Sequence, residues 1–378
     1  MKNQPPGSTQ RLASLDAFRG FTIASMLLVN NPGDWSNLYS QLAHAHWNGW
    51  TFTDWIFPFF LFIGGVSMTF SLGRQAEAGA DKGALLRKLF KRAALIFMIG
   101  LALNFIPKFD PSTLRIPGVL QRIALCTALA APLVVYFNWR QQLAWIAGLL
   151  AFYSAMMLLV PVPGPDGVVA AGLLEPGRDV GAYIDRLFLT GHMWVQSRTW
   201  DPEGLFTTIP ALCSQLFGVL TGRWLLARRE PAETTVWMLM AGLAALLAGA
   251  VLDVVLMPIN KSLWTTSYCF FTTGWALVMF SVFYWLLDAA PSATLRATVA
   301  RHAKFFTIYG MNALFIFALS GLVAKMIGFF KLGPVLYAPV KALPLEPQAT
   351  SLLYALGFNA VMFAVAWFMW RRRWFVKV

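Results

Sequence analysis

The chain has 378 residues, of which 58% are apolar and only 12% are charged, and its formal net charge is +13. A soluble domain carries about 25% charged residues, so this composition excludes an ordinary soluble protein. The apolar residues fall in runs of about twenty, the length that crosses a bilayer as a helix, and they lack the alternation of barrel strands. We therefore expect an all-α, polytopic membrane protein.

The apolar runs predict ten transmembrane helices in a single membrane domain, residues 1–378. Met1 to Gln10 is polar and the first apolar run has no cleavage site after it, so no signal peptide is expected. The three cysteines, Cys126, Cys213 and Cys269, fall in spans and are interpreted as small core residues rather than as a disulfide framework. The expected spans are 16–31, 55–72, 89–105, 119–137, 143–160, 205–226, 237–257, 266–287, 306–328 and 352–370.

Charge orients these spans. With ten spans both termini share one side, and placing them inside puts 20 of the 30 Lys and Arg residues in inner segments. The positive-inside rule then predicts cytoplasmic termini. The loop at residues 161–204 and the segment around His44 would face outward, into the periplasm if this is a bacterial inner-membrane protein. Because the basic residues lie in short loops between helices, nucleic-acid binding is not expected.

The first span ends in Val29-Asn30-Asn31-Pro32-Gly33, and the loop after it contains His44-Ala45-His46-Trp47-Asn48-Gly49. The amide of Asn30 could cap the helix or could orient a substrate. His44 and His46 could carry out acid–base chemistry, or could sit with Trp47 in an interfacial aromatic belt. A metal site is not expected, since no third ligand stands at a regular spacing.

Charged residues at the ends of later spans are further candidates. Asp54 could cap the second span or pair with an imidazole or an ammonium substrate. Arg122, inside the fourth span, could pair with Asp253 or bind an anion such as a phosphate. Lys261, in a very short outer turn, could also contact an anion or merely snorkel toward water.

The outer loop at residues 161–204 is rich in Pro and Gly, and loops of this length tend to be functional or mobile. At its end, Asp201 and Glu203 could cap the sixth span or bind a cationic amino sugar. In the ninth span, Asn312 is expected to form a hydrogen bond between helices.

Taken together, these segments resemble the heparan-alpha-glucosaminide N-acetyltransferase family, including its compact bacterial members. Any one of them would be a weak signal, but they occur in the order of the family. They are SLDAFRGFTI (14–23), Val29-Asn30, HAHWNGWTFTDWIFPFFLFIGG (44–65), RIPGVLQRIALC (115–126), DPEGL (201–205), PINKSLWTTS (258–267) and GMN (310–312).

The resemblance implies a membrane-embedded acetyltransferase that uses acetyl-CoA to acetylate the amine of a glucosamine-like sugar on the far side of the membrane. The active-site histidine of the family, in H-A-x-W-N-G, corresponds to His44 rather than to His46, and its active-site asparagine corresponds to Asn30. The spacing between the two is slightly longer here. The resemblance is also compatible with a homodimer.

On this reading, His44 and Asn30 are the expected catalytic residues. His44 could remove a proton from the amine, or could take the acetyl group itself in a two-step route. The expected acetyl-CoA ligands are Arg122 and Lys261, and no metal cofactor is expected. A transporter of an amino sugar is the alternative, but the sequence has no evident inverted repeat of the kind common in transporters. The expected contacts with the amino sugar are Asp54, Trp47, Asn48, Asp201 and Glu203.

Overall fold

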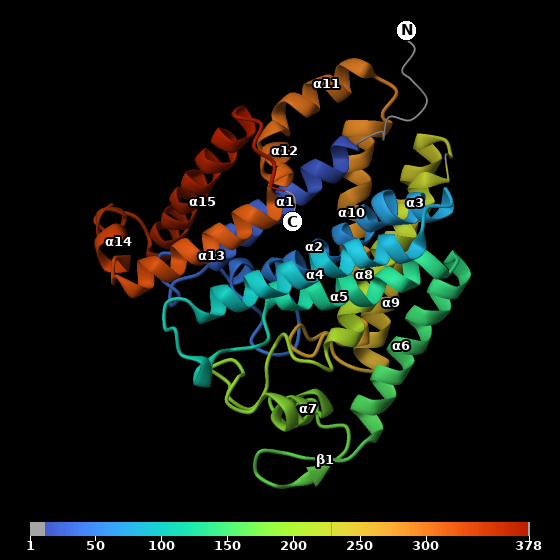
Figure 1. The fold of residues 1–378 in the computed structure, drawn as a ribbon. Helices are drawn as coiled ribbons and strands as arrows, with labels where there is room; N and C mark the ends of the chain where they lie inside the picture. Colours follow the sequence, from blue (N-terminus) through green and yellow to red (C-terminus); the bar gives the residue numbers. More distant parts are fainter. Residues whose placement is uncertain (1–11, 228, 377–378) are drawn as a thin grey trace.

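The computed structural model describes residues 12–227 and 229–376, and almost all regular structure within them is helical (Figure 1). The polar segment from Met1 to Gln10 lies outside the described residues. So do Lys2, Arg11, Arg228 and Lys377, which contribute to the charge argument. The long helices are α1 (Ala13–Asn30), α2 (Phe52–Met68), α4 (Lys82–Phe105), α5 (Val119–Tyr136), α6 (Trp139–Leu159), α8 (Thr208–Leu226), α9 (Pro231–Val255), α10 (Thr266–Tyr284), α13 (Ala313–Phe329) and α15 (Pro347–Arg371).

Shorter elements connect or extend these helices. A π-helical segment, η2 (Thr69–Gly73), joins α2 to α3 (Arg74–Glu77), and a second one, η4 (Trp285–Ala289), extends α10. The outer loop contains the antiparallel pair β1 (Val162–Pro163) and β2 (Val169–Ala170), followed by α7 (Val180–Leu189). The remaining elements are η1 (Ser40–Leu42), η3 (Pro111–Thr113), α11 (Ala293–His302), α12 (Lys304–Met311) and α14 (Gly333–Lys341).

A helix lies at each of the ten predicted positions. Among the described residues, seven helical stretches are long and apolar enough to cross a membrane: α2 to α3, α5, α6, α8, α9, α10 to η4, and α15. The polytopic all-α fold is therefore confirmed. The helices α1 and α4 are as long, but Asp16 and Arg19 lie in α1 and five basic residues lie in the first half of α4, which lowers their mean hydropathy.

The ninth predicted span, 306–328, is not one straight helix. It is divided into α12 and α13, which meet at an angle of 82°. At the break, the Asn312 side chain donates a hydrogen bond to Trp374 O (3.0 Å) and accepts one from Val376 N (2.9 Å). Asn312 thus bonds to the chain after α15, whereas the sequence predicts a contact between helices within a continuous span.

The centre of the bundle is formed by α2, α5 and α8. Within their most apolar windows 72% of the α2 residues are buried, against 33% for α6 and only 17% for α9, so α6 and α9 lie at the periphery. Glycines let α2 and α8 approach closely, because a Cβ atom at Gly65 would lie 2.0 Å from Gln215 O and one at Gly218 would lie 2.0 Å from Phe62 O. Such small residues are how membrane helices pack without a hydrophobic driving force between them.

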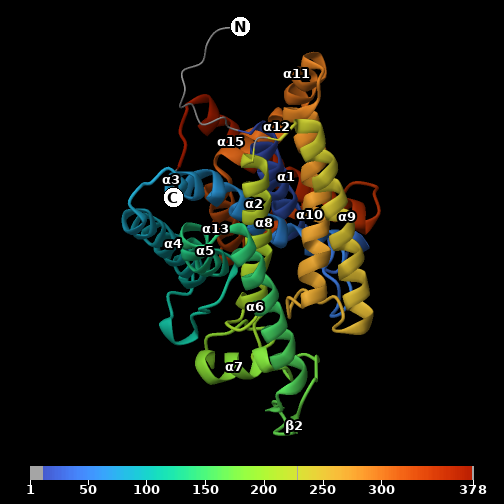
Figure 2. The ribbon, with the colours of Figure 1, turned by 90° about the vertical axis from the view of Figure 1, so that its right-hand side faces the viewer.

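The two ends of the bundle carry the segments that the charge argument places on opposite membrane faces. Figure 2 shows α11 at the top and α7 with β2 at the bottom, with α8, α9 and α10 running between them. These two segments therefore lie at opposite ends of the bundle, and the membrane face of each end stays a prediction. We call the end with α7 the outer end. The segment around His44 also lies at this end, because Trp47 Nε1 donates a hydrogen bond to Leu174 O in the outer loop.

Candidate active site

The histidine-containing loop is held against the short turn that joins α9 to α10. The amide N–H of Gly49 donates to Ile259 O at 2.7 Å, and Asn260 Nδ2 donates to Asn48 Oδ1 at 3.0 Å. Asn260 is itself fully buried, and its other hydrogen bonds, to Leu263 N and Thr265 Oγ1, fix the shape of the turn. The turn can therefore hold the loop in one position.

Within the loop, His44 pairs with Asp54. His44 Nδ1 lies 2.7 Å from Asp54 Oδ1, and 47% of the imidazole side chain remains exposed. A carboxylate can only accept, so this contact places a proton on Nδ1 and leaves Nε2 as the acceptor nitrogen of the neutral ring. The sequence left open whether Asp54 caps a helix or pairs with an imidazole, and the structure shows that it does both.

The carboxylate of Asp54 is buried, with 1% of its side chain exposed. Its Oδ2 accepts the backbone N–H of Ala45 (3.1 Å) and the backbone N–H and hydroxyl of Thr51 (both 3.0 Å), and the Thr51 contact forms the capping box at the start of α2. The hydroxyl of Tyr268 donates to the backbone oxygen of Asp54 at 2.6 Å. The Asp54 carboxylate is thus held in place by protein donors, and it orients the imidazole of His44.

Lys261 completes this group. Its Nζ lies 2.9 Å from Nδ1 and 3.2 Å from Nε2 of His44, and 3.6 Å from Asp54 Oδ1. Burial lowers the pKa of the Lys261 ammonium, while the negative charge of Asp54 opposes that change. With Nδ1 protonated, only Nε2 can accept a hydrogen bond from the ammonium, so Lys261 must turn to the substrate before Nε2 can take a proton. The sequence suggests an anion contact for Lys261, and only the fold reveals its position beside the imidazole.

The outer loop packs on the same site. Besides the hydrogen bond from Trp47 to Leu174, the Trp47 ring meets the Trp200 ring edge-on, with their centroids 5.1 Å apart. Asp179 caps α7 through a hydrogen bond to Ala182 N, and Asp185 accepts the N–H of Leu205 at 2.9 Å. Residues 161–204 are therefore a folded cover over the outer end.

A second ionic group lies at the end of this loop, where Arg115 pairs with Asp201 and Glu203. Arg115 Nε and Nη2 contact the two oxygens of Asp201 at 2.9 and 2.6 Å, and Nη2 also contacts Glu203 Oε2 at 2.6 Å. The backbone N–H groups of Trp194 and Glu203 also bond to Asp201. Since α8 begins at Thr208 with Thr207 as its N-cap residue, neither carboxylate caps that helix, contrary to one of the two interpretations of the sequence.

Arg122 is buried, with only 1% of its surface exposed. Its Nη2 donates to Gly204 O (3.0 Å) and to the hydroxyl of Thr207, and its guanidinium lies over the Trp264 ring, 5.3 Å from the centroid. The alternative pairing with Asp253 is wrong, because Asp253 Oδ1 instead accepts Ile259 N at 2.5 Å. Nε and Nη1 of Arg122 have no hydrogen-bond partner among the described residues. Two free donors on a buried cation are the feature expected of an anion or carbonyl site.

The structure thus brings together some of the predicted residues and leaves others apart. Asn30 is exposed at the end of α1, and its side chain forms no hydrogen bond within the described residues; the amide that bonds back to the helix is Asn31, with Leu27 O at 2.8 Å. His46 is exposed and has no contact with the pair of His44 and Asp54 among the described residues. Sequence reasoning did not assign roles to Arg115 or Asn260, although both lie inside conspicuous polar segments between spans.

This arrangement is suited to proton transfer beside an acyl group. An exposed imidazole oriented by a buried carboxylate is the base–orienter pair used in acyl transfer, and it requires only a substrate hydrogen within reach of Nε2. The ammonium of Lys261 and the free donors of Arg122 are charges that can stabilise an oxyanion or a phosphate.

Comparison with known proteins adds an independent observation. The family model described as "Heparan-alpha-glucosaminide N-acetyltransferase, catalytic" matches residues 11–249. The heparan-alpha-glucosaminide N-acetyltransferase of Homo sapiens is 30% identical over 328 residues, which cover 74% of this chain and 49% of the relative. That of Mus musculus is 28% identical over 331 residues, covering 74% and 50%. The chain spans about half the length of the curated relatives that it matches. The residues matched by the family model include His44, Asp54 and Arg122 but end before Lys261.

Proposed function

Because the chain belongs to the heparan-alpha-glucosaminide N-acetyltransferase family, we propose that it is a membrane acetyltransferase that moves an acetyl group from acetyl-CoA to the amine of a glucosamine-like sugar. The names of its relatives give the reaction and the type of acceptor. The single observation in this chain that carries the proposal is the exposed imidazole of His44, with its Nδ1 held by the buried Asp54 at 2.7 Å.

His44 is the proposed base. An amino sugar is mostly protonated near neutral pH, and its neutral amine must lose a further proton after attacking a thioester. The amine nitrogen forms a bond to the carbonyl carbon, the carbon–sulfur bond breaks, and Nε2 of His44 takes the proton from nitrogen and returns it to the departing thiolate. Asp54 stabilises the imidazolium formed in between, as a buried carboxylate does in other acyl-transfer sites. In the two-step version, Nε2 attacks the thioester carbonyl first and CoA leaves as the thiolate; the amine then attacks the acetyl-imidazole and frees Nε2.

Lys261 and Arg122 are the proposed contacts of acetyl-CoA. Lys261 lies at the imidazole, so it can donate to the acyl oxygen as negative charge develops there. Nε and Nη1 of Arg122, beside Trp264, have no partner among the described residues and can bind a carbonyl or phosphate oxygen of the donor molecule. Asn30 is the proposed amide that orients the acyl oxygen or His44 from the end of α1.

The acceptor contacts that we propose are Trp47, Asn48 and Glu203. Asn48 is exposed, and among the described residues its side chain bonds only through Oδ1, to Asn260, so its amide nitrogen is available to a sugar hydroxyl. Within the same part of the chain, the Glu203 carboxylate bonds only through Oε2, to Arg115. Asp201 and Asp54, by contrast, have their oxygens taken by protein donors and hold the site together from behind.

We also propose that both termini face the cytoplasm and that His44 faces the opposite side of a bacterial inner membrane. A reporter fused near Gly79 should be cytoplasmic, and one near Gly164 should be external. The reverse pattern would contradict the orientation and would place the acceptor in the cytoplasm.

The reaction is tested directly with purified protein, labelled acetyl-CoA and glucosamine. Formation of labelled N-acetylglucosamine that depends on the protein is the expected result, and its absence with any amino sugar would reject the proposal. Brief incubation without acceptor separates the two routes: label trapped on the wild type and lost in His44→Ala indicates an acetylated histidine, whereas no label on the wild type indicates direct transfer.

A further inference from the structure

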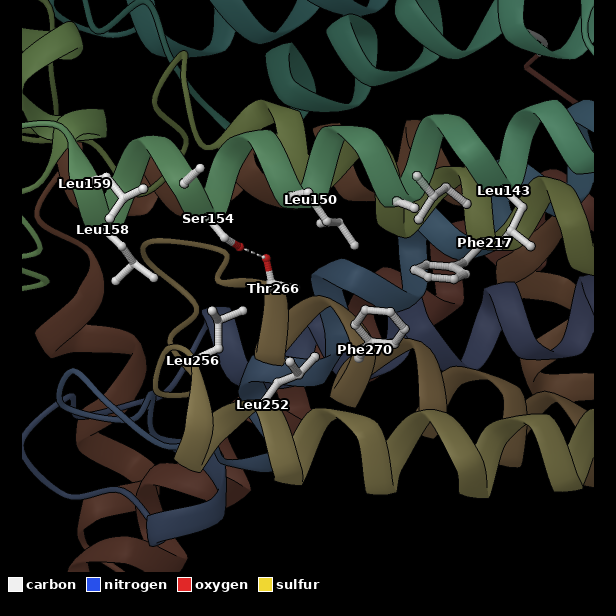
Figure 3. Close-up of a pocket in the computed structure, with 14 residues that line it drawn as sticks. Leu143, Leu150, Ser154, Leu158, Leu159, Phe217, Leu252, Leu256, Thr266 and Phe270 are labelled. Carbon is white, nitrogen blue, oxygen red and sulfur yellow. Dashed lines mark hydrogen bonds between the residues drawn. The ribbon is translucent and has the colours of Figure 1, made fainter.

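An apolar groove with a volume of about 690 Å³ lies between α6, α9 and α10, away from the imidazole (Figure 3). Three alanines of α6, Ala147, Ala151 and Ala155, lie four residues apart on one face of the helix and line it. Because these side chains are small, they leave the space that a larger residue would fill. The opposite walls are formed by leucines of α9 and by the first turns of α10.

The groove faces the lipid side of the bundle. Its walls include α6 and α9, whose apolar windows are only 33% and 17% buried. Lining residues such as Leu159, with 73% of its surface exposed, and Leu143, with 47%, would meet the hydrocarbon core of a bilayer. An occupant of this groove therefore comes from the membrane rather than from water.

The polar groups of the groove are already paired with each other. Figure 3 shows Ser154 and Thr266 joined across it, and their hydroxyl oxygens are 2.8 Å apart. Neither hydroxyl is left without a partner among the described residues. A polar ligand such as a sugar or the pantetheine arm would find no free group there and would lose its own hydration, whereas a hydrocarbon chain would lose nothing.

The groove and the candidate active site are built on the same helical hairpin. Leu252 and Leu256 precede the turn between α9 and α10, and Thr266 and Phe270 follow it. The same turn holds the histidine loop through Ile259 and Asn260 and presents Lys261 to the imidazole. One helical hairpin thus forms a wall of the groove with its two arms and part of the site with its tip.

From this shared hairpin and the apolar, lipid-facing lining of the groove we propose that the acceptor is an amino sugar attached to a membrane lipid, with a hydrocarbon chain in the groove and the sugar at His44. The inference rests on the proposed acetyltransferase function and specifies its substrate class. Lipid tails are as apolar as the groove, so no hydrophobic gain draws the chain in. The groove instead aligns the chain by packing, and it thereby positions the sugar amine beside the imidazole.

The test compares two acceptors that differ only in the anchor, a hexadecyl glucosaminide and a methyl glucosaminide with free amines, using full-length protein in phospholipid vesicles and labelled acetyl-CoA. Ala151→Phe fills the middle of the groove. We expect it to lower kcat/KM for the hexadecyl acceptor by about tenfold, a typical result of overfilling a packed site, and to leave kcat/KM for the methyl acceptor unchanged.

The matched control is Ala144→Phe, which makes the same change at an exposed position of α6 that does not line the groove. It should alter neither value. If Ala151→Phe does not fold, Ala155→Leu is a milder filling of the same groove and carries the same expectation.

The possible outcomes separate the inference from the function on which it rests. If Ala151→Phe and Ala155→Leu leave the ratio of the two kcat/KM values unchanged, the groove holds only bulk lipid and the inference is wrong. If either variant changes the oligomeric state instead, the groove is an interface between two copies, and the inference is again wrong. If neither acceptor is acetylated by the wild type, the proposed function itself fails.

Discussion

Two ionic groups at the outer end of the molecule have the same design but different partners. In one, the buried Asp54 holds His44; in the other, the buried Asp201 holds Arg115. Each carboxylate also accepts backbone N–H groups, so that neither has capacity left for a substrate. A guanidinium does not release its proton in proteins, whereas an imidazole exchanges one near neutral pH.

The exposure of the two side chains also indicates that His44 is the reactive group and Arg115 a structural one. The imidazole of His44 is 47% exposed, while the Arg115 side chain is 24% exposed and is bound to two carboxylates. The comparison shows that a buried carboxylate at the edge of a membrane is not itself informative about function. The side chain that pairs with the carboxylate determines whether the carboxylate orients a reactive group or stabilises a loop.

The largest effect is expected at the imidazole. His44→Ala should lower the rate of acetyl transfer by about 100- to 10,000-fold, because it removes the group that transfers the proton. An exposed loop residue contributes little to packing, so folding and acetyl-CoA binding should persist. The measurement is steady-state transfer with labelled acetyl-CoA.

His46→Ala is the control, since His46 lies two residues away and has no contact with the pair of His44 and Asp54 among the described residues. It should retain most of the activity. Near-normal transfer by His44→Ala would instead make His44 an interfacial residue.

For the pair of Arg115 and Asp201 we expect a loss of stability rather than a loss of activity. Asp201→Ala leaves Arg115 without its main partner, and removing one member of a buried pair typically costs about 3–5 kcal/mol of stability. Its thermal unfolding midpoint should fall clearly, while the molecules that remain folded should keep the acetyl-transfer rate of the wild type.

The rate of acetyl transfer per folded molecule distinguishes the catalytic role of His44 from the structural role of Asp201. If Asp201→Ala lost as much activity as His44→Ala at unchanged stability, Asp201 would be a catalytic residue rather than a structural partner of Arg115.

A third test concerns the buried cation behind the site. Arg122→Ala should weaken acetyl-CoA binding by about tenfold or more, as a charge-assisted hydrogen bond contributes roughly 1.5–3 kcal/mol. Lys261→Ala should do the same if Lys261 contacts the donor. Equilibrium binding to the folded variants is the measurement, and unchanged affinity would assign either residue a structural role.

The smallest effect concerns a third buried carboxyl, Asp185 in α7. Burial raises its pKa to about 7, although it accepts hydrogen bonds from Leu205 and Asp201 N–H groups. Since its pKa is higher in the folded than in the unfolded chain, its contribution to stability is present below about pH 4 and is lost as the pH rises toward about 7. The slope for one group is at most about 1.4 kcal/mol per pH unit.

Hydrogen exchange of the α7 amides, corrected for intrinsic rates, reports this directly. Protection should be greater at about pH 5 than at about pH 8 in the wild type. The difference should be smaller in Asp185→Asn, where Asp179, the α7 cap whose pKa burial raises to about 6, still titrates. A pH dependence of unchanged size in Asp185→Asn would show that Asp185 does not contribute to it.

The sequence by itself determined the class of fold and the position of the central motif. Runs of twenty apolar residues require helices in a bilayer, because every backbone polar group must be satisfied within its own segment. The bend at Asn312 was not predicted, since the partners of the Asn312 side chain at the bend are residues 374 and 376, far along the chain.

Only the tertiary structure decided which polar residues share a site. Lys261 lies 217 positions from His44 along the chain, and Arg115 lies 86 from Asp201. No local pattern relates such residues, so their partners could not be read from spacing, and the pairing of Arg122 with Asp253 that spacing allowed does not occur. The hydrophobic pattern of a helix depends on residues close together in the sequence, so it can be recognised there. Buried charges find their partners only after the helices have packed, because desolvation and hydrogen bonding then select which groups pair.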